Sequence, residues 1–138
     1  MRLISIHIFK WQEEEPILLA HKMDLSMLYF YQKGMAKEHI NFNSRMIAGR
    51  IPPGNKAKVT LENNLGECYC HTTKDNISAT VITDTDYQEK AAFILLNNVL
   101  MDFRETFSAN PSIYEDAKED VELKYSNLDI FLKKWQNP

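Results

Sequence analysis

The stretch Arg2-Leu3-Ile4-Ser5-Ile6-His7-Ile8-Phe9-Lys10-Trp11 decides the fold class, because it has the pattern of a β-strand with apolar residues on both faces. Alternate residues of a strand point to opposite faces. One face carries Ile4, Ile6 and Ile8, and the other carries Leu3, Phe9 and Trp11, interrupted by Ser5 and His7. A strand that is apolar on both faces is covered on both faces. We therefore predict a three-layer domain with helices above and below one sheet.

The residues that follow predict a hairpin and then a helix. The polar stretch 12–16 is short enough that residues 17–23 must form an antiparallel second strand. A helical pattern then runs from about Gly34 to Arg50 and is stopped by Ile51-Pro52-Pro53-Gly54. Its core-facing stripe consists of Ala36, Ile40, Asn43, Ile47 and Ile51.

Three short strands come next, over residues 56–62, 67–73 and 77–83, and the turns between them are short enough for a meander. The first of these strands alternates cleanly, with Ala57, Val59 and Leu61 on one face and polar residues on the other. This alternation indicates a strand with one solvated face, near an edge of the sheet.

The last part of the chain predicts two helices. Asp86 and Glu89 have the spacing of a capping box, and a broad apolar stripe follows them through Ala92, Phe93, Leu96, Val99, Leu100, Phe103 and Phe107. Residues 110–112 end this helix, and the acidic stretch 115–122 is expected to be a solvated linker. Leu128, Phe131, Leu132 and Trp135 repeat with the spacing of a final helix. The predicted order is β-β-α-β-β-β-α-α, an α+β fold.

Length and composition describe one globular domain over residues 1–138. Hydrophobic residues make up 44% of the chain and charged residues 25%. The net charge of −3 argues against a nucleic-acid partner, which would favour a basic patch. No apolar run is long enough to span a bilayer. Cys68 and Cys70 are two residues apart and so point to the same face of a strand, too close along the chain for an unstrained disulfide. We expect them to be buried, reduced thiols.

The sequence offers no constellation typical of an active site. The histidines (His7, His21, His39 and His71) are scattered over different predicted elements, and Cys68-x-Cys70-His71 lacks a second ligand cluster. A glycine-rich phosphate loop and a Gly-x-Ser-x-Gly elbow are both missing. Asp84, Asp86 and Glu89 are better explained as helix-start residues than as an acidic catalytic cluster. We expect no catalytic residue, no cofactor and no metal.

Phe42 is the residue that points to a function. With Ile40 set at 0° on its helix, Phe42 lies roughly 200° away, on the face that should be solvated. Met46 and His39 flank it, and the half-solvated strand supplies Val59 and Leu61 as backing. An exposed strip of this kind would form a groove for an apolar peptide or a lipid chain. A different outcome stays open, in which residues 28–31 fold over Phe42.

Three blocks of the chain resemble a known family, the longin domains of lipid-anchored R-SNAREs (synaptobrevin homologues). The first block, residues 37–50, is similar to the first helix of that family, with its phenylalanine at Phe42. The second is Thr80-Val81-Ile82-Thr83-Asp84-x-Asp86-Tyr87 and the helix after it, with Ala91-Ala92-Phe93-x-Leu95-Leu96-x-x-Val99-Leu100-x-x-Phe103. The third, Leu128-x-x-Phe131-Leu132-x-x-Trp135, resembles the last helix.

The resemblance implies a fold and a role. The fold would be the profilin-like longin fold, a five-stranded antiparallel sheet between one helix and two. The role would be regulation of vesicle fusion in transport between endoplasmic reticulum and Golgi. In that role the domain binds its own SNARE motif, or shields a prenyl or palmitoyl chain, and so holds the protein in a closed, autoinhibited cytosolic state. His39, Phe42, Met46, Val59 and Leu61 would form the binding surface.

The same resemblance implies features that lie outside residues 1–138. Cognate Q-SNAREs would bind through the coiled-coil SNARE motif, and lipidation would attach the full-length protein to Golgi and other endomembranes. Neither the SNARE heptads nor a C-terminal Cys-a-a-X box occurs in this chain. We interpret residues 1–138 as a single longin domain that cannot itself form a fusion complex.

Two rival functions remain at this point, and one region departs from the family. Residues 108–125 do not follow the family pattern, so their path is not predicted. The chain could instead be a longin-type subunit of an adaptor or tethering complex. It could also be a ligand-sensing domain of similar three-layer build, which would need an internal cavity with converging polar groups.

Overall fold

The fold is a single five-stranded sheet with helices on both faces. The structure, a computed structural model, describes residues 2–26, 30–62 and 64–138. The strands are β1 (Leu3–Lys10), β2 (Ile17–Met23), β3 (Asn55–Thr60), β4 (Glu67–Thr72) and β5 (Ile77–Thr83). Their order in the sheet is β2-β1-β5-β4-β3, and every neighbouring pair is antiparallel. The predicted hairpin and meander are both present and meet along β1 and β5.

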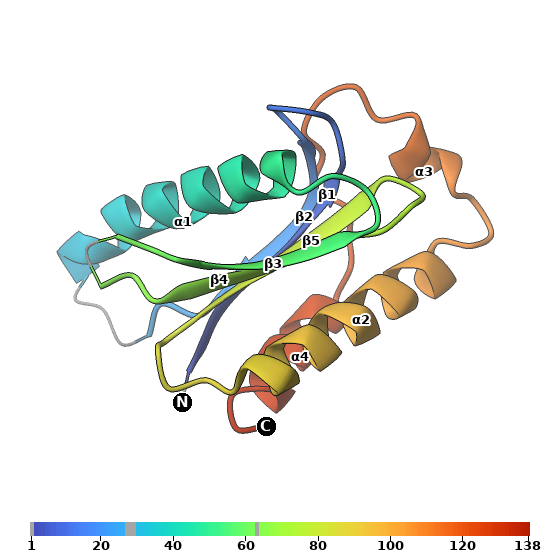
Figure 1. Cartoon of the computed structure of the whole chain (residues 1–138). Helices are drawn as coiled ribbons and strands as arrows, with labels where there is room; N and C mark the ends of the chain where they lie inside the picture. Colours follow the sequence, from blue (N-terminus) through green and yellow to red (C-terminus); the bar gives the residue numbers. More distant parts are fainter. Residues whose placement is uncertain (1, 27–29, 63) are drawn as a thin grey trace.

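The helices are α1 (Phe30–Arg50), α2 (Glu89–Thr106), α3 (Ser112–Glu115) and α4 (Asn127–Lys134). Figure 1 shows α1 lying across one face of the sheet and α2 and α4 side by side under the other. This is the predicted arrangement of one helix opposite two. The structure adds the short α3, and α1 begins earlier than Gly34, where the helical pattern was predicted to start.

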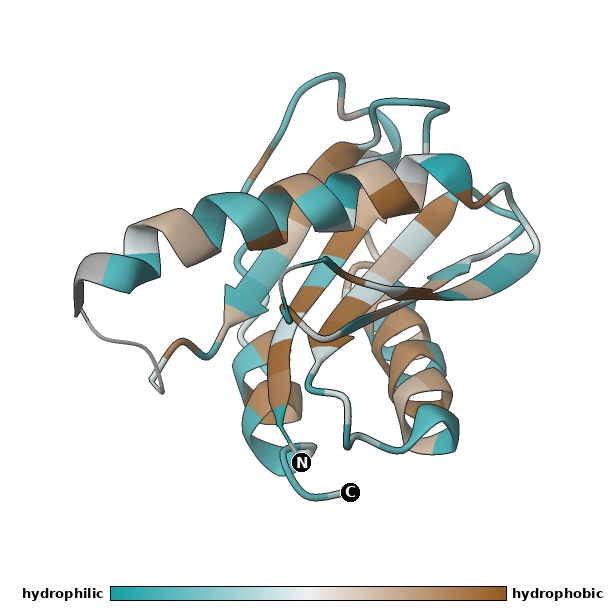
Figure 2. Cartoon of the chain, turned by 60° about the vertical axis from the view of Figure 1, so that its left-hand side comes forward, coloured by the Kyte–Doolittle hydropathy of each residue, from teal (hydrophilic) through white to brown (hydrophobic). Residues whose placement is uncertain are grey.

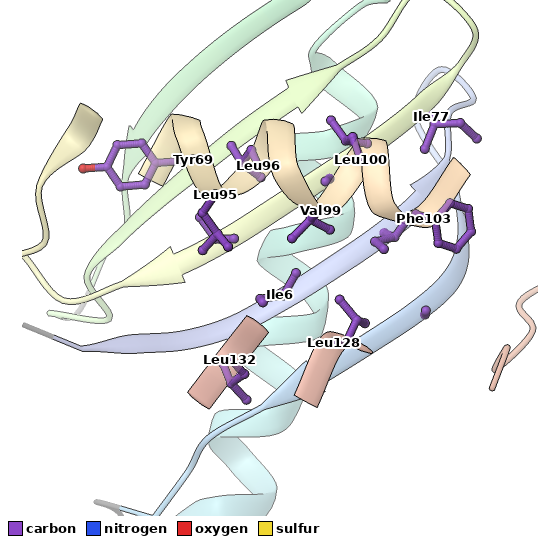
Figure 3. Packing of buried hydrophobic residues seen from close by; sticks show 14 of the residues in the cluster. Ile6, Tyr69, Ile77, Leu95, Leu96, Val99, Leu100, Phe103, Leu128 and Leu132 are labelled. Atoms are coloured by element: carbon purple, nitrogen blue, oxygen red, sulfur yellow. The ribbon is translucent and has the colours of Figure 1, made fainter. Parts of the chain in front are cut away.

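Each face of the sheet has its own core. Between the sheet and α1 lie Phe9, Leu18, Ile40, Ile47, Ala48, Leu61, Cys68, Cys70 and Ile82. The larger core, between the sheet and α2 and α4, is built from residues such as Ile6, Tyr69, Leu96, Phe103 and Leu132 (Figure 3). The two cysteines are free and buried, as predicted. Central strands β1 and β5 therefore pack on both faces, which explains their apolar sequences.

The faces of the sheet predicted for Leu3 and Ile4, at the start of β1, are wrong. Leu3 packs in the larger core with Ile6 and Ile8, whereas Ile4 packs on the α1 side. The pairing of β1 with β5 shifts between Leu3 and Ser5. An irregularity of this kind breaks the strict alternation of side chains, so the residues before it swap faces.

The capping box predicted at Asp86 is also not formed. The first helical residue is Glu89 and its N-cap is Gln88, and none of the side chains that the structure describes caps the helix. Tyr87 is buried instead, and its hydroxyl donates a hydrogen bond to the carbonyl oxygen of Trp135 at 2.6 Å. Packing of Tyr87 against the C-terminal region thus holds residues 84–88 in a turn, and α2 begins only at Glu89.

The acidic stretch 115–122 is not simply a solvated linker. The backbone amides of Val121 and Leu123 donate to the carbonyl oxygens of Leu18 and Leu19 on β2, at 2.9 and 3.0 Å. The backbone amide of Leu18 in turn donates to Asp120. The segment therefore covers the outer edge of β2, a location that charge composition alone could not predict.

Candidate binding groove between the first helix and an edge strand

A buried hydrogen bond fixes which side of α1 faces the sheet. His7 on β1 is buried, and its Nε2–H donates to Oδ1 of Asn41 on α1 at 2.7 Å. Burial lowers the pKa of His7 to about 3, so the ring is neutral near pH 7. Ile40 and Ile47 pack on the same side of the helix. The opposite side of α1 must therefore face away from the core.

Phe42 lies on that outward side, as its position on the helix predicts. Its side chain is 65% exposed. His39 is also exposed and Met46 is half-buried. Figure 2 shows apolar and polar segments alternating along α1, which lies across one face of the sheet. The alternative in which residues 28–31 cover Phe42 involves Leu28 and Tyr29, which lie outside the described residues.

The structure brings all five predicted surface residues to one groove. His39, Phe42 and Met46 line its α1 wall, and Val59 and Leu61 line its β3 wall. The groove has a volume of about 350 Å³. Its remaining lining residues are Asn43, Ile47, Thr60, Glu62 and Leu65. The apolar side chains thus form a hollow with polar residues at its rim.

The floor of the groove depends on a tight turn after β3. Leu61 is buried, and its amide donates to the carbonyl oxygen of Gly66 at 2.9 Å. Gly66 has a φ of +108°, and a Cβ atom there would lie 1.9 Å from the carbonyl oxygen of Thr83. Only glycine fits this position. Leu65, the residue before Gly66, packs against the core on the α1 side and lines the groove together with Leu61.

The β3 wall is also an edge of the sheet. β3 has β4 as its only neighbour in the sheet formed by the described residues, whereas the opposite edge strand, β2, is covered by residues 121–123. Val59 is 36% exposed and lies opposite Cys68 of β4. An edge strand next to an apolar hollow can accept a peptide both through its backbone and through side-chain burial.

Sequence reasoning missed two parts of this region. It did not place Leu65 in the groove, because an apolar residue in a predicted turn carries no periodicity. It also treated the histidines as scattered, yet His7 and His21 lie opposite each other on β1 and β2 with ring centroids 5.1 Å apart. The hairpin predicted from residues 2–23 could have indicated that pairing.

Metal-binding clusters and membrane-spanning helices are both absent from the part of the chain that the structure describes. There, no group of three or more histidine, cysteine or acidic residues is placed to hold a metal ion. None of the helices in that part is long and apolar enough to cross a bilayer.

Comparison with known proteins agrees with this arrangement. A family model described as a longin, or regulated-SNARE-like, domain matches residues 25–127. A putative synaptobrevin homolog YKT6 from Dictyostelium discoideum is 34% identical over the whole chain, which spans 68% of that relative. The synaptobrevin homolog ykt6 of Schizosaccharomyces pombe is 29% identical and the VAMP-like protein YKT61 of Arabidopsis thaliana 28% identical. In both, all of this chain aligns with 67% of the relative.

The family match covers most of the chain, and the relatives align from end to end of it. The matched region includes both α1 and β3, the elements that form the two walls of the groove. The chain therefore belongs to the longin family, as a relative of the YKT6-type synaptobrevin homologues.

Proposed function

We propose that this domain regulates an R-SNARE in vesicle trafficking by binding the SNARE motif of its own protein in the α1–β3 groove. Kinship with YKT6-type synaptobrevin homologues supports a role in SNARE-dependent trafficking. The observation that carries the finer proposal is the exposed Phe42, which stands at a groove where His39, Met46, Val59 and Leu61 also meet. The role is one of binding and not of catalysis.

The energetics favour an occupant that is itself apolar. Folding does not bury Phe42, so this side chain leaves most of its hydrophobic free energy unused. Full burial of a phenylalanine contributes roughly 1.5–3 kcal/mol. The amphipathic heptads of a SNARE motif would cover Phe42 and Val59 with their apolar stripe. A SNARE motif bound in this way could not pair with partner SNAREs, and the protein would be held in the closed state.

A lipid anchor is the other occupant that the closed state would shield. A second hollow of about 190 Å³ lies under the first half of α1 and shares Leu65 with the groove. It is lined by Arg2, Ile4, Asp24, Leu25, Ala36, Ile40, Asn64 and Leu65. Its apolar residues would suit part of a prenyl or palmitoyl chain. Shielding of the chain would keep the protein in the cytosol, and release would allow it to reach Golgi and other endomembranes.

The proposal places the SNARE motif and the lipid attachment site outside the domain described here. The matched region spans 67–68% of the three relatives, so each of them has residues beyond it. In this proposal the longin domain supplies the control and the additional segments supply fusion and attachment. Partner Q-SNAREs would bind those additional segments.

Substitution of Phe42 by glutamate tests the proposal. We expect Phe42→Glu to weaken binding of a peptide that spans the SNARE motif of a YKT6-type homologue by about tenfold or more, since burial of the ring is worth at least 1.4 kcal/mol. The fold should survive, because Phe42 is exposed and glutamate is a better helix former than phenylalanine. Isothermal titration calorimetry gives the dissociation constant.

The matched control is Met101→Glu, which charges a residue that is 61% exposed on α2, on the other side of the sheet. Its dissociation constant should equal that of the unmodified domain. If folded Phe42→Glu binds the peptide as tightly as Met101→Glu, the groove is not the SNARE-binding surface. A stable complex with an adaptor-type partner would then favour the rival function.

A further inference from the structure

Met46 lies where the groove continues past Phe42 toward the end of α1. Its side chain lines three hollows. The first is the α1–β3 groove, the second lies beside the β1–β2 turn, and the third, of about 710 Å³, lies at the C-terminal end of α1. The third hollow is lined by Trp11, Glu13, Glu14, Met46, Gly49, Arg50 and Pro52. The apolar surface of Phe42 and Met46 therefore runs directly into a region that contains glutamates.

The glutamate-bearing β1–β2 turn is fixed against α1. At Gly49, a Cβ atom would lie 2.9 Å from the carbonyl oxygen of Glu14 and 3.0 Å from Cδ of Pro16, so only glycine allows this close approach. The indole N–H of Trp11 donates to the carbonyl oxygen of Ala48 at 3.1 Å. Glu14 adopts a φ of +70°, in the left-handed region. These contacts hold the turn in one place, at the edge of the exposed apolar surface.

The β1–β2 turn carries more acidic than basic side chains where it meets the end of α1. The C-terminal end of a helix carries a partial negative charge, so carboxylates beside it raise the electrostatic free energy. Glu13 and Glu14 are exposed at the end of α1, and neither takes part in an ion pair found among residues 2–26, 30–62 and 64–138. Of the two arginines nearby, Arg45 is bound to both carboxylate oxygens of Asp120, and Arg50 lines the same hollow as Glu13 and Glu14, where it offsets one of their two charges. A partner with positive charge would relieve this arrangement.

We propose that the occupant of the groove is a basic amphipathic segment, whose apolar side chains cover Phe42 and Met46 and whose lysine or arginine side chains reach Glu13 and Glu14. This inference rests on the proposed function and adds the charge of the partner to it. The half-buried Trp11 and Met46 would pack against the aliphatic stems of those basic side chains. Charge complementarity next to the apolar surface selects a peptide over an uncharged lipid chain and sets which end of the peptide lies over the turn.

Two synthetic helical peptides with the same leucine heptads test this inference, one with lysines at one end and one with glutamines there. We expect the lysine peptide to bind the unmodified domain about fivefold more tightly at low salt, since exposed ion pairs are individually weak. The double substitution Glu13→Gln and Glu14→Gln should abolish that preference. The control is Glu105→Gln with Glu115→Gln, which makes the same change in net charge at exposed residues elsewhere and should keep the preference.

Two results separate this inference from the proposed function. If the Glu13→Gln/Glu14→Gln domain still prefers the lysine peptide, the acidic turn does not select the partner and the inference is wrong. If Phe42→Glu leaves binding of both peptides unchanged, the groove itself is not the docking surface and the proposed function fails. The inference also requires the lysine preference to fade when salt shortens the screening length.

Discussion

His7 contacts the side of α1 that faces the sheet, and Phe42 lies on the side that faces away from it. His7 is held neutral by burial and donates to Asn41, the residue directly before Phe42. Asn41 lies on the same side of α1 as the buried Ile40 and Ile47, and Phe42, roughly 200° from Ile40, points away from it. The wheel position of Phe42 could be predicted from Ile40 and Ile47 alone. The hydrogen bond that fixes it could not, because His7 and Asn41 are far apart in sequence.

The buried His7 should make the domain sensitive to mild acid. In the unfolded chain His7 binds a proton near its usual pKa of 6.5, but in the fold only near pH 3. The stability that neutral His7 contributes is therefore complete above pH 6.5 and is lost as the pH falls toward 3, by up to about 1.4 kcal/mol per pH unit. Urea unfolding should show a free energy about 2 kcal/mol lower near pH 5 than near pH 7.

The variant His7→Gln supplies the comparison, because its side-chain amide can still donate to Asn41 but does not titrate. It should lose less stability between the two pH values than the unmodified domain. Some loss should remain, since burial also lowers the pKa of His21. An equal loss in both proteins would mean that His7 does not cause the acid sensitivity.

Among the elements, the predictions fail where an interaction between distant segments decides the local structure. The strands and long helices could be predicted from periodicity, because the spacing of apolar residues within each element indicates which face it buries. The start of α2 depends on Tyr87 contacting Trp135, and the path of 117–125 depends on β2 offering an unpaired edge. The residues of α2 do not indicate the contact with Trp135, and the residues of segment 117–125 do not indicate the contact with β2.

The contact of segment 117–125 with β2 gives a prediction about Asp120. Its carboxylate accepts hydrogen bonds from Arg45 and from the amide of Leu18. We expect Asp120→Asn to destabilise the domain by about 1 kcal/mol, the usual value for a partly exposed pair with an added hydrogen bond. The amides of Val121 and Leu123 should lose hydrogen-exchange protection more than the rest of the sheet.

Asp116→Asn provides the control for that experiment, because Asp116 is exposed in the same acidic region. It should leave the exchange of Val121 and Leu123 unchanged. If Asp120→Asn also leaves their protection unchanged, the segment is held on β2 by its backbone hydrogen bonds alone.

For the whole molecule, the decisive feature is that the two edges of the sheet differ. One edge, β2, is covered by residues 121–123, and the other, β3, borders the groove under Phe42. The three-layer class, the strand order within the hairpin and meander, and five of the residues that line the groove followed from the sequence and its resemblance. The acidic turn at the end of α1 did not, because only the close approach at Gly49 brings Glu14 beside Met46.

Chemical-shift mapping is the most direct test of the central claim, that the α1–β3 groove binds a SNARE motif. The ¹⁵N-labelled domain would be titrated with a peptide spanning the SNARE motif of a YKT6-type homologue, beside a Phe42→Glu sample. We expect amide shifts concentrated in residues 37–50 and 56–62, and we expect them to be lost in the variant. Shifts that map to α2 and α4 instead, or none at millimolar peptide, would contradict it.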